Sequence, residues 1–451
     1  MRTMLVPLVA VALLASGVHA AELTAVVHKP TADVYAEPRL DAPRVTTLQR
    51  NTQVKISSQQ GLWYQLQIPD GASGYVRVND LRVNYAGTEG SEANVRVLMG
   101  GKAGKGRVTE TAGVRGVDES DLKAASFNQA QLDAMVGHRV EADAAAAYAG
   151  EQGWQATSVA YAGEAKRGQK GKKANAETAS SAAGLARSVG GLLGSFGAGG
   201  ASAMLSGTGS KLDGAAKVAP KSEEALAAEE IALGPAITGR ILGARPLLDD
   251  AGAQQRINRV GRWVASQTSR PELPWTFGVI DTPEVNAFAA PGGFILVTRG
   301  LYELLSSDSE LAAVLGHEIS HCVQRDHYEV IRKQELTATG KDVAMKDVGA
   351  GNDSVAGTYA RNYVEKNGAT IVLTSLDREA EFRSDEAAEF YLARAGMNPL
   401  ALYSVLQRLT ALGSESASLA QLYKTHPPLD ARLDRIDQRG YATLEAYTSR
   451  E

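Results

Sequence analysis

Residues 317–321 read His-Glu-Ile-Ser-His, and this segment constrains the chain more than any other feature of its sequence. Two histidines four residues apart on a helix lie on one face, so both imidazoles can reach one metal ion. Ser307 with Glu310 predicts a capping box, and the apolar residues at 311, 314 and 315 supply a helical stripe. Ionisable groups on such a stripe are costly to bury unless something satisfies them, and a metal ion would. The segment therefore predicts two metal ligands, His317 and His321, with Glu318 close enough to hold a metal-bound water.

A second acidic segment offers the third ligand, since a hydrolytic zinc site generally has three protein ligands and one open position. Glu381 and Asp385 lie four residues apart on a helix that we expect over residues 376–395. We expect Glu381 to bind the metal and Asp385 to accept the second ring N–H of a ligand histidine. Glu379 falls on another face and should be solvated. The alternative is an ordinary acidic helix with i,i+4 salt bridges to arginine.

Composition narrows the classes of function. The chain has 451 residues, which suggests two or three domains, and 47 basic against 51 acidic residues give no argument for nucleic acid or an anionic membrane. Cys322 is the only cysteine, so the chain can form no intrachain disulfide. Its side chain should point about 100° away from the histidine face. This favours a buried thiol over a zinc thiolate.

Residues 1–20 have the pattern of a secretory signal peptide, with Arg2, an apolar run from Leu5 to Leu14 and small residues up to Ala20. The apolar run is short for an uncleaved membrane anchor, which is the alternative. No later stretch has the pattern of a transmembrane helix, so we expect an exported protein without a transmembrane anchor. The periplasm of a Gram-negative bacterium is the expected place, or secretion otherwise.

The rest of the chain divides by composition into four parts. Residues 21–85 alternate short β-rich runs with turns and predict a small all-β barrel. The five expected strands are 32–35, 44–48, 53–57, 63–67 and 74–78. Residues 86–162 are ambiguous and partly helical, and their alanine-rich faces promise little core. Residues 163–225 are rich in Gly, Ala and Ser and predict a flexible linker. Residues 226–451 predict a mainly helical domain with a small sheet, so the fold class is α+β. The helices expected in this part are 222–233, 251–266, 307 to about 334, 376–395, 399–412 and 429–440, and the strands are 275–280, 285–288 and 294–298.

The barrel segment resembles a bacterial Src-homology-three-like domain. The matching features are Asp33–Tyr35 with Pro38, Gly61–Tyr64, and Gly74–Val76 before Leu81. The resemblance implies contact with peptidoglycan or an envelope protein through residues 21–85. A structural module without a ligand is the alternative.

The C-terminal part resembles metallopeptidase family 48, which includes heat-shock proteases, CAAX prenyl proteases and periplasmic quality-control proteases. The matching segments, in family order, are Val285–Gly293, Ser309–His321, Glu381 with Asp385, Ala395–Pro399 and Thr425–Pro428.

The resemblance implies one zinc ion per chain on His317, His321 and Glu381, a zincin-like fold, Glu318 as general base and Asp385 as the partner of a ligand histidine. His426 then matches a histidine near the metal, as an extra ligand or a stabiliser of the transition state, with Arg432 downstream. Residues Val285, Asn286, Ala287 and Phe288 match the strand that would bind substrate. His327 lies outside the motif, and we expect a surface or packing histidine.

Membrane members of the family carry transmembrane helices where this chain has a polar, Gly-rich segment from Glu335 to Thr374. That segment is a hypothetical lid. The leading interpretation is a zinc endopeptidase acting on unfolded or misfolded envelope proteins. The alternatives are a chaperone-like or scaffold protein with latent proteolysis, and a cell-wall binding protein led by the barrel.

Overall fold

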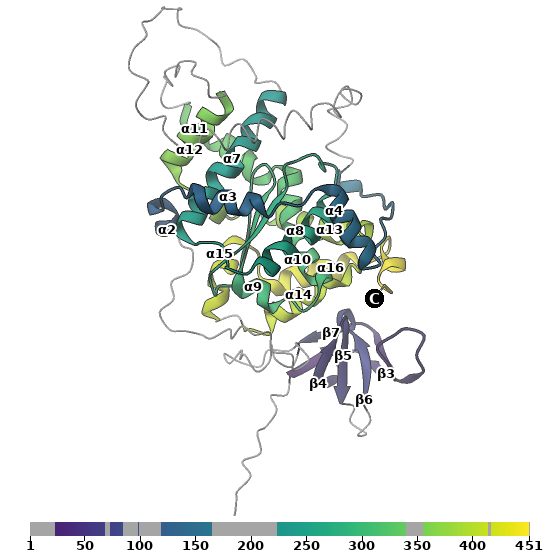
Figure 1. Cartoon of the computed structure of the whole chain (residues 1–451). Helices are drawn as coiled ribbons and strands as arrows, with labels where there is room; N and C mark the ends of the chain where they lie inside the picture. Colours follow the sequence, from purple (N-terminus) through teal and green to yellow (C-terminus); the bar gives the residue numbers. More distant parts are fainter. Residues whose placement is uncertain are drawn as a thin grey trace, which may run out of the picture.

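The computed structural model describes residues 23–67, 73–83, 98, 119–164, 223–339, 355–413 and 416–450 (Figure 1). The predicted signal peptide and most of the predicted linker lie outside these ranges. The described residues combine an N-terminal all-β sheet with a mainly helical domain that holds a small mixed sheet, which confirms the α+β class. Within this part of the chain, no helix is both long and apolar enough to cross a membrane.

The N-terminal sheet has seven strands in the order β3-β2-β6-β5-β4-β1-β7. Burial alternates along most of them, so one face forms the barrel core. Five of the strands were predicted; β1 and β7, which pair with each other, were not. The elements are β1 (Leu23–Val27), β2 (Thr31–Tyr35), β3 (Arg44–Gln49), β4 (Gln53–Gln60), β5 (Trp63–Gln67), β6 (Ser73–Arg77), the 3₁₀ turn η1 (Val78–Asp80) and β7 (Leu81–Val83).

Three helices follow, α2 (Glu119–Ala124), α3 (Gln129–Gly137) and α4 (Ala142–Glu151). The alanine-rich sequence of this region predicted few buried side chains, but Leu122, Leu132 and Met135 are fully buried. They pack on the C-terminal domain rather than on one another, with α2 and α3 against α7 and α4 against α8. Gly243 of α7 permits this contact, because a Cβ there would lie 1.7 Å from the carbonyl oxygen of Ser126.

The C-terminal domain surrounds a three-stranded sheet in the order β8-β10-β9. Strand β10 is parallel to β8 and antiparallel to β9, so β9 is an edge strand. The elements are α7 (Glu223–Ala244), α8 (Ala251–Ala265), β8 (Thr276–Ile280), β9 (Ala287–Ala290), β10 (Phe294–Thr298), α9 (Arg299–Leu304), α10 (Asp308–Gln324), α11 (Asp326–Thr339), α12 (Val355–Asn367), η2 (Thr370–Leu373), α13 (Arg378–Arg394), α14 (Leu400–Thr410), η3 (Ala417–Leu419), α15 (Ala420–Thr425), α16 (Leu429–Arg439) and η4 (Glu445–Tyr447).

The helix predicted from Ser307 to about Gln334 is wrong in one respect, because it breaks in two. Arg325 adopts a left-handed conformation with φ of 61°, and its N–H bonds to the carbonyls of His321 and Cys322. This cap ends α10, and α11 begins at Asp326 in a new direction. The break brings the first residues of α11 close to the end of the histidine face.

The barrel is joined to the C-terminal domain by buried polar contacts. Gln59 of β4 donates to Ser404 Oγ of α14 at 2.8 Å, and Ser404 donates to Glu310 of α10 at 2.9 Å. Arg408 also donates to Glu310, at 2.6 Å. Gln407 donates to the carbonyl oxygen of Leu81 at 2.7 Å. Through Ser404, the barrel is therefore linked to the helix end that the predicted capping box occupies.

Candidate metal centre

Helix α10, which carries the two histidines of the motif, has a capped N-terminus. Ser307 is the N-cap, and its Oγ accepts the N–H of Glu310 at 3.2 Å, as predicted. The carboxylate of Glu310 accepts the N–H of Ser306 at 2.8 Å, instead of the N–H of Ser307 that a capping box would use. From this start, the helix places His317, Glu318 and His321 about three to four turns later, all at most 4% exposed.

Helix α13 supplies the acidic half of the site. Asp377 caps its N-terminus by accepting the N–H of Ala380 at 2.8 Å. The two helices approach closely at Gly316, where a Cβ would lie 3.3 Å from the Cα of Ala388. This packing buries Glu381 and Asp385 against α10, each 2% exposed.

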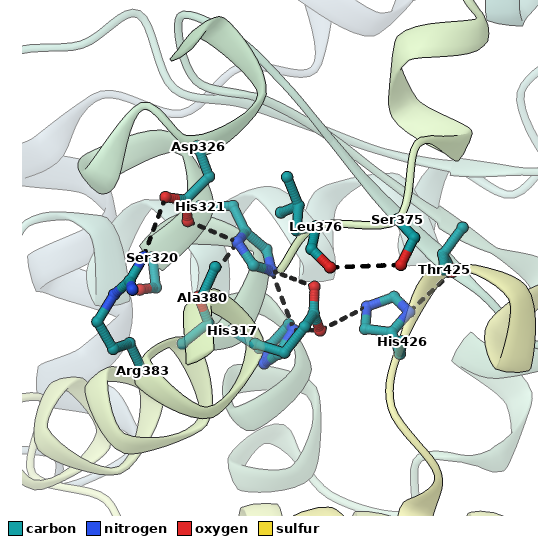
Figure 2. Close-up of polar contacts among 12 residues, drawn as sticks. His317, Ser320, His321, Asp326, Ser375, Leu376, Ala380, Arg383, Thr425 and His426 are labelled. Carbon is teal, nitrogen blue, oxygen red and sulfur yellow. Dashed lines mark hydrogen bonds and ion pairs between the residues drawn. The ribbon is translucent and has the colours of Figure 1, made fainter. Parts of the chain in front are cut away.

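Four side chains converge on one point, His317, His321, Glu381 and His426, and their nearest donor atoms all lie within 4.8 Å of one another (Figure 2). The Nε2 atoms of His317 and His321 are 3.2 Å apart. Glu381 lies 3.4 Å from His317 Nε2 and 3.7 Å from His321 Nε2. His426 Nε2 lies 3.6 Å from Glu381.

These donors fit a zinc ion. Imidazole nitrogen and carboxylate oxygen are its usual ligands, and ligands about 2.0–2.1 Å from a tetrahedral ion lie about 3.3–3.4 Å apart. Among the described residues, Glu381 Oε2 is buried and has no hydrogen-bond partner. A buried carboxylate oxygen without a partner is costly unless a cation or a water satisfies it. Nearby imidazoles outweigh the effect of burial and hold the pKa of Glu381 well below its ordinary value.

Asp385 contacts His317. Its Oδ1 lies 2.9 Å from His317 Nδ1, and Arg432 of α16 donates to both of its oxygens, at 2.5 and 2.9 Å. Burial alone would lower the pKa of His317, but the carboxylates of Asp385 and Glu381, 2.9 and 3.4 Å from its ring nitrogens, raise it to about 9 in the metal-free site. The guanidinium of Arg432 and the ring of His317 hold the pKa of Asp385 below its ordinary range despite burial.

His321 also has a carboxylate partner at its second ring nitrogen, which the sequence did not predict. Asp326, the first residue of α11, places Oδ2 2.9 Å from His321 Nδ1 (Figure 2). Ser384 Oγ lies 3.1 Å from the same nitrogen, and Arg383 lies 3.5 Å from Asp326 Oδ1. On one continuous helix, residues five apart do not share a face. The contact is possible only because the helix breaks at Arg325, and no local sequence pattern indicated that break.

Glu318 lines a small cavity between the donor cluster and the edge strand β9, with a volume of about 20 Å³. Burial raises the pKa of Glu318 above its ordinary value. Of the predicted substrate strand, Ala287 and Phe288 line the cavity, whereas Val285 and Asn286 precede β9 and are fully buried. The described lining residues are Ala287, Phe288, Ala289, Glu318, His321, His327, Val372, Thr374, Leu376, Glu381, Thr425 and His426.

The structure also gives positions for the other residues that the sequence singled out. His426 follows α15, and burial lowers its pKa to about 3. His327 was expected on the surface or in packing. It is buried, which agrees with packing, and it also lines the cavity. Cys322 is buried, as predicted, and burial raises the pKa of its thiol. Glu379 is exposed, as predicted, and pairs with Arg435 at 3.3 Å.

Two segments of the chain match known protein families. Residues 251–440 match the sequence profile of peptidase family M48, and residues 30–82 match that of the bacterial SH3 domain. The chain carries an M48 peptidase domain. Both resemblances inferred from sequence motifs are therefore confirmed. Peptidases of this family are in general zinc-dependent, and the donor cluster lies within the matched residues.

Several curated proteins are similar to this M48 domain. The β-barrel assembly-enhancing protease of Escherichia coli K12 is 28% identical over 213 residues, which are 46% of this chain and 42% of that protein. Its Yersinia pestis counterpart is 29% identical over 47% of this chain and 44% of its own length. The mitochondrial metalloendopeptidase OMA1 of Arabidopsis thaliana is 29% identical over 40% of this chain and 35% of its own length. The matched region spans less than half of each relative.

Proposed function

We propose that this chain is a zinc-dependent endopeptidase of the cell envelope that hydrolyses peptide bonds in unfolded or misfolded proteins. The observation that carries the proposal is the convergence of donor atoms from α10, α13 and the residue after α15 around a buried carboxylate oxygen that has no other partner among the described residues. The M48 match and the protease names of the relatives support the same reaction class.

In this proposal His317, His321 and Glu381 hold one zinc ion, which when bound supplies the Lewis acidity that activates a water and polarises a peptide carbonyl. Glu318 lines the cavity beside these residues and takes the proton of the attacking water. It then passes that proton to the nitrogen of the leaving amine. Its raised pKa suits the first role, because a carboxylate with a higher pKa takes up a proton more readily, and a carboxylic acid is still acidic enough to donate that proton to the leaving amine.

His426 and Arg432 differ in what they can reach. His426 lines the cavity, so in the proposal its ring either hydrogen-bonds the oxyanion or fills a fourth ligand position. Arg432 is 4% exposed and directs its guanidinium at Asp385. We therefore assign Arg432 to positioning Asp385, and through it His317, rather than to contact with substrate.

The edge strand β9 offers a way to bind an extended substrate. It pairs with β10 on one side, and Ala287 and Phe288 line the cavity. A substrate segment that adds as a further strand would lie across the donor cluster, and only an unfolded segment can present such a backbone. This geometry supports the proposal that unfolded proteins are the substrates.

The cavity is small, which bears on the lid hypothesis. Its volume of about 20 Å³ has room for one water molecule. Thr374 and Leu376 belong to its walls, so a substrate must displace them. Residues 340–354 of the predicted lid lie outside the described residues. A cavity too small for a peptide also fits the alternative, a scaffold protein with latent proteolysis.

We place the protein in the periplasm, where the barrel would contact peptidoglycan or an envelope protein. The signal-peptide pattern of residues 1–20, the bacterial SH3 match and the assembly-enhancing names of the bacterial relatives support this placement. Cell fractionation of the full chain and a peptidoglycan pull-down would test it.

The decisive experiment compares the wild type with Glu318→Gln. We expect the variant to keep stoichiometric zinc but to lose casein cleavage by at least about 100-fold, because the ligands survive while the base does not. Glu379→Gln, an exposed acid on α13, is the matched control and should cleave normally. Equal cleavage by Glu318→Gln would remove Glu318 from the reaction. If Glu318→Gln also restored envelope function in a deletion strain, the scaffold alternative would be favoured.

A further inference from the structure

His327 is a buried histidine that the reaction described above does not use. It is 7% exposed, and within the described part of the chain its Nε2 atom has no hydrogen-bond partner. Its ring centroid lies 6.0 Å from that of His321. His327 is outside the group of four side chains whose donor atoms lie within 4.8 Å of one another. It therefore lies beside the proposed zinc ligands without being one of them.

The residues on either side of His327 are firmly held. Asp326 contacts His321, Arg325 pairs with Glu230 at 2.9 Å, and Tyr328 donates to Glu229 at 3.2 Å. The first turn of α11 is thus anchored by its other side chains. His327 is fixed in place by its neighbours while its own Nε2 stays unsatisfied. Such an arrangement costs stability and pre-organises a group for an external partner.

The position of His327 indicates what that partner is. It lines the cavity at the donor cluster together with Ala287, Phe288 and Ala289 of the edge strand. It also lines a second recess, which contains Ala289 and Pro291 but neither Ala287 nor His426. His327 therefore lies at the Ala289 end of β9. A substrate segment that adds as a strand beside β9 would pass within reach of its ring there.

We propose that Nε2 of His327 hydrogen-bonds the main chain of an extended peptide substrate at the Ala289 end of β9. The inference rests on the proposed endopeptidase function and adds a substrate-contacting residue to it. Nε2 of a neutral imidazole either donates or accepts one hydrogen bond, so it can pair with a backbone C=O or with a backbone N–H. A contact with the main chain holds any sequence, in keeping with unfolded proteins as substrates.

The test uses the full zinc-loaded chain and a fluorogenic peptide of about ten residues. His327→Leu removes the ring nitrogens, whereas His327→Gln keeps a donor and an acceptor. We expect KM to rise about 10-fold in His327→Leu, the ratio for one net hydrogen bond, and to recover to within about 3-fold of wild type in His327→Gln. Zinc content and inhibition by acetohydroxamate, which contacts only the metal region, should not change. His138→Leu, at the end of α3, is the matched control and should leave KM unchanged.

Three results would overturn the proposal: an unchanged KM in His327→Leu, a loss of zinc in the same variant, or a KM in His327→Gln as high as in His327→Leu. The third result would show that only packing matters. A chain that cleaves nothing would refute the endopeptidase proposal instead. In that case the affinity of Glu318→Gln for the same peptide, with and without His327→Leu, still decides the role of His327.

Discussion

Replacing Asp385 with alanine should have two separable effects, one on stability and one on metal affinity. Asp385 accepts two hydrogen bonds from Arg432 and one from His317, and all three side chains are at most 5% exposed. Removal of one member of a buried ion pair costs about 3–5 kcal/mol, because the other charge stays buried without its partner. Loss of the group that orients a ligand histidine typically costs about 10–100-fold in metal affinity, or about 1.4–2.7 kcal/mol.

Denaturant unfolding of the metal-free protein measures the first effect, and competition with a zinc chelator measures the second. The double variant Asp385→Ala/Arg432→Met removes the uncompensated charge, so it should recover most of the stability but none of the zinc affinity. Glu379→Ala on the same helix is the control: its pair with Arg435 is exposed, so the expected change is below about 1 kcal/mol. If Asp385→Ala unfolded like the wild type and bound zinc within about 3-fold of it, the orienting role of Asp385 would be refuted.

Three further predictions concern the metal. Glu381→Ala should lose stoichiometric zinc, since only two histidines would remain from the proposed three-ligand set; normal zinc content by elemental analysis would exclude Glu381 as a ligand. Asp326→Asn should weaken zinc binding about 10–100-fold through the orientation of His321, and an unchanged affinity in chelator competition would contradict it. Zinc affinity should fall as the pH is lowered through the neutral range, because the pKa of His317 is raised to about 9 and below that pH the metal must displace its proton. Titration calorimetry in buffers of different ionisation enthalpy should therefore report proton release at neutral pH, and none would contradict the assignment.

Several elements were predictable because local chemistry decides them. The helix predicted at Ala251–Ser266 is observed as Ala251–Ala265, and the strand at Phe294–Thr298 has the predicted bounds. In each case periodic apolar residues or a short β-rich run lie between turn residues. Helix α7 was predicted to end at Leu233, but it continues through Pro235 to Ala244. Tertiary packing overrides the helix-breaking tendency of that proline, because the residues that follow it are buried.

In the candidate site, too, some features follow from local sequence and others only from tertiary packing. The i,i+4 spacing of His317 with His321, and of Glu381 with Asp385, placed each pair on one helical face, and both pairs are found there. The pairing of Asp385 with Arg432, and the closeness of His426 to Glu381, depend on how α13, α15 and α16 pack. The family resemblance could name those residues but could not show their contacts.

The amino-acid sequence by itself determined the α+β class, the helices that bear the proposed ligands and the residue types that suit zinc, because these follow from periodicity, capping and side-chain chemistry over short spans. Only the tertiary structure decided that α10 ends at Arg325, that Asp326 reaches His321, and that His327 is buried with an unsatisfied nitrogen. The physical reason is that a break in one helix and the packing of segments far apart in the chain set these contacts. Neither leaves a periodic signal in the residues concerned.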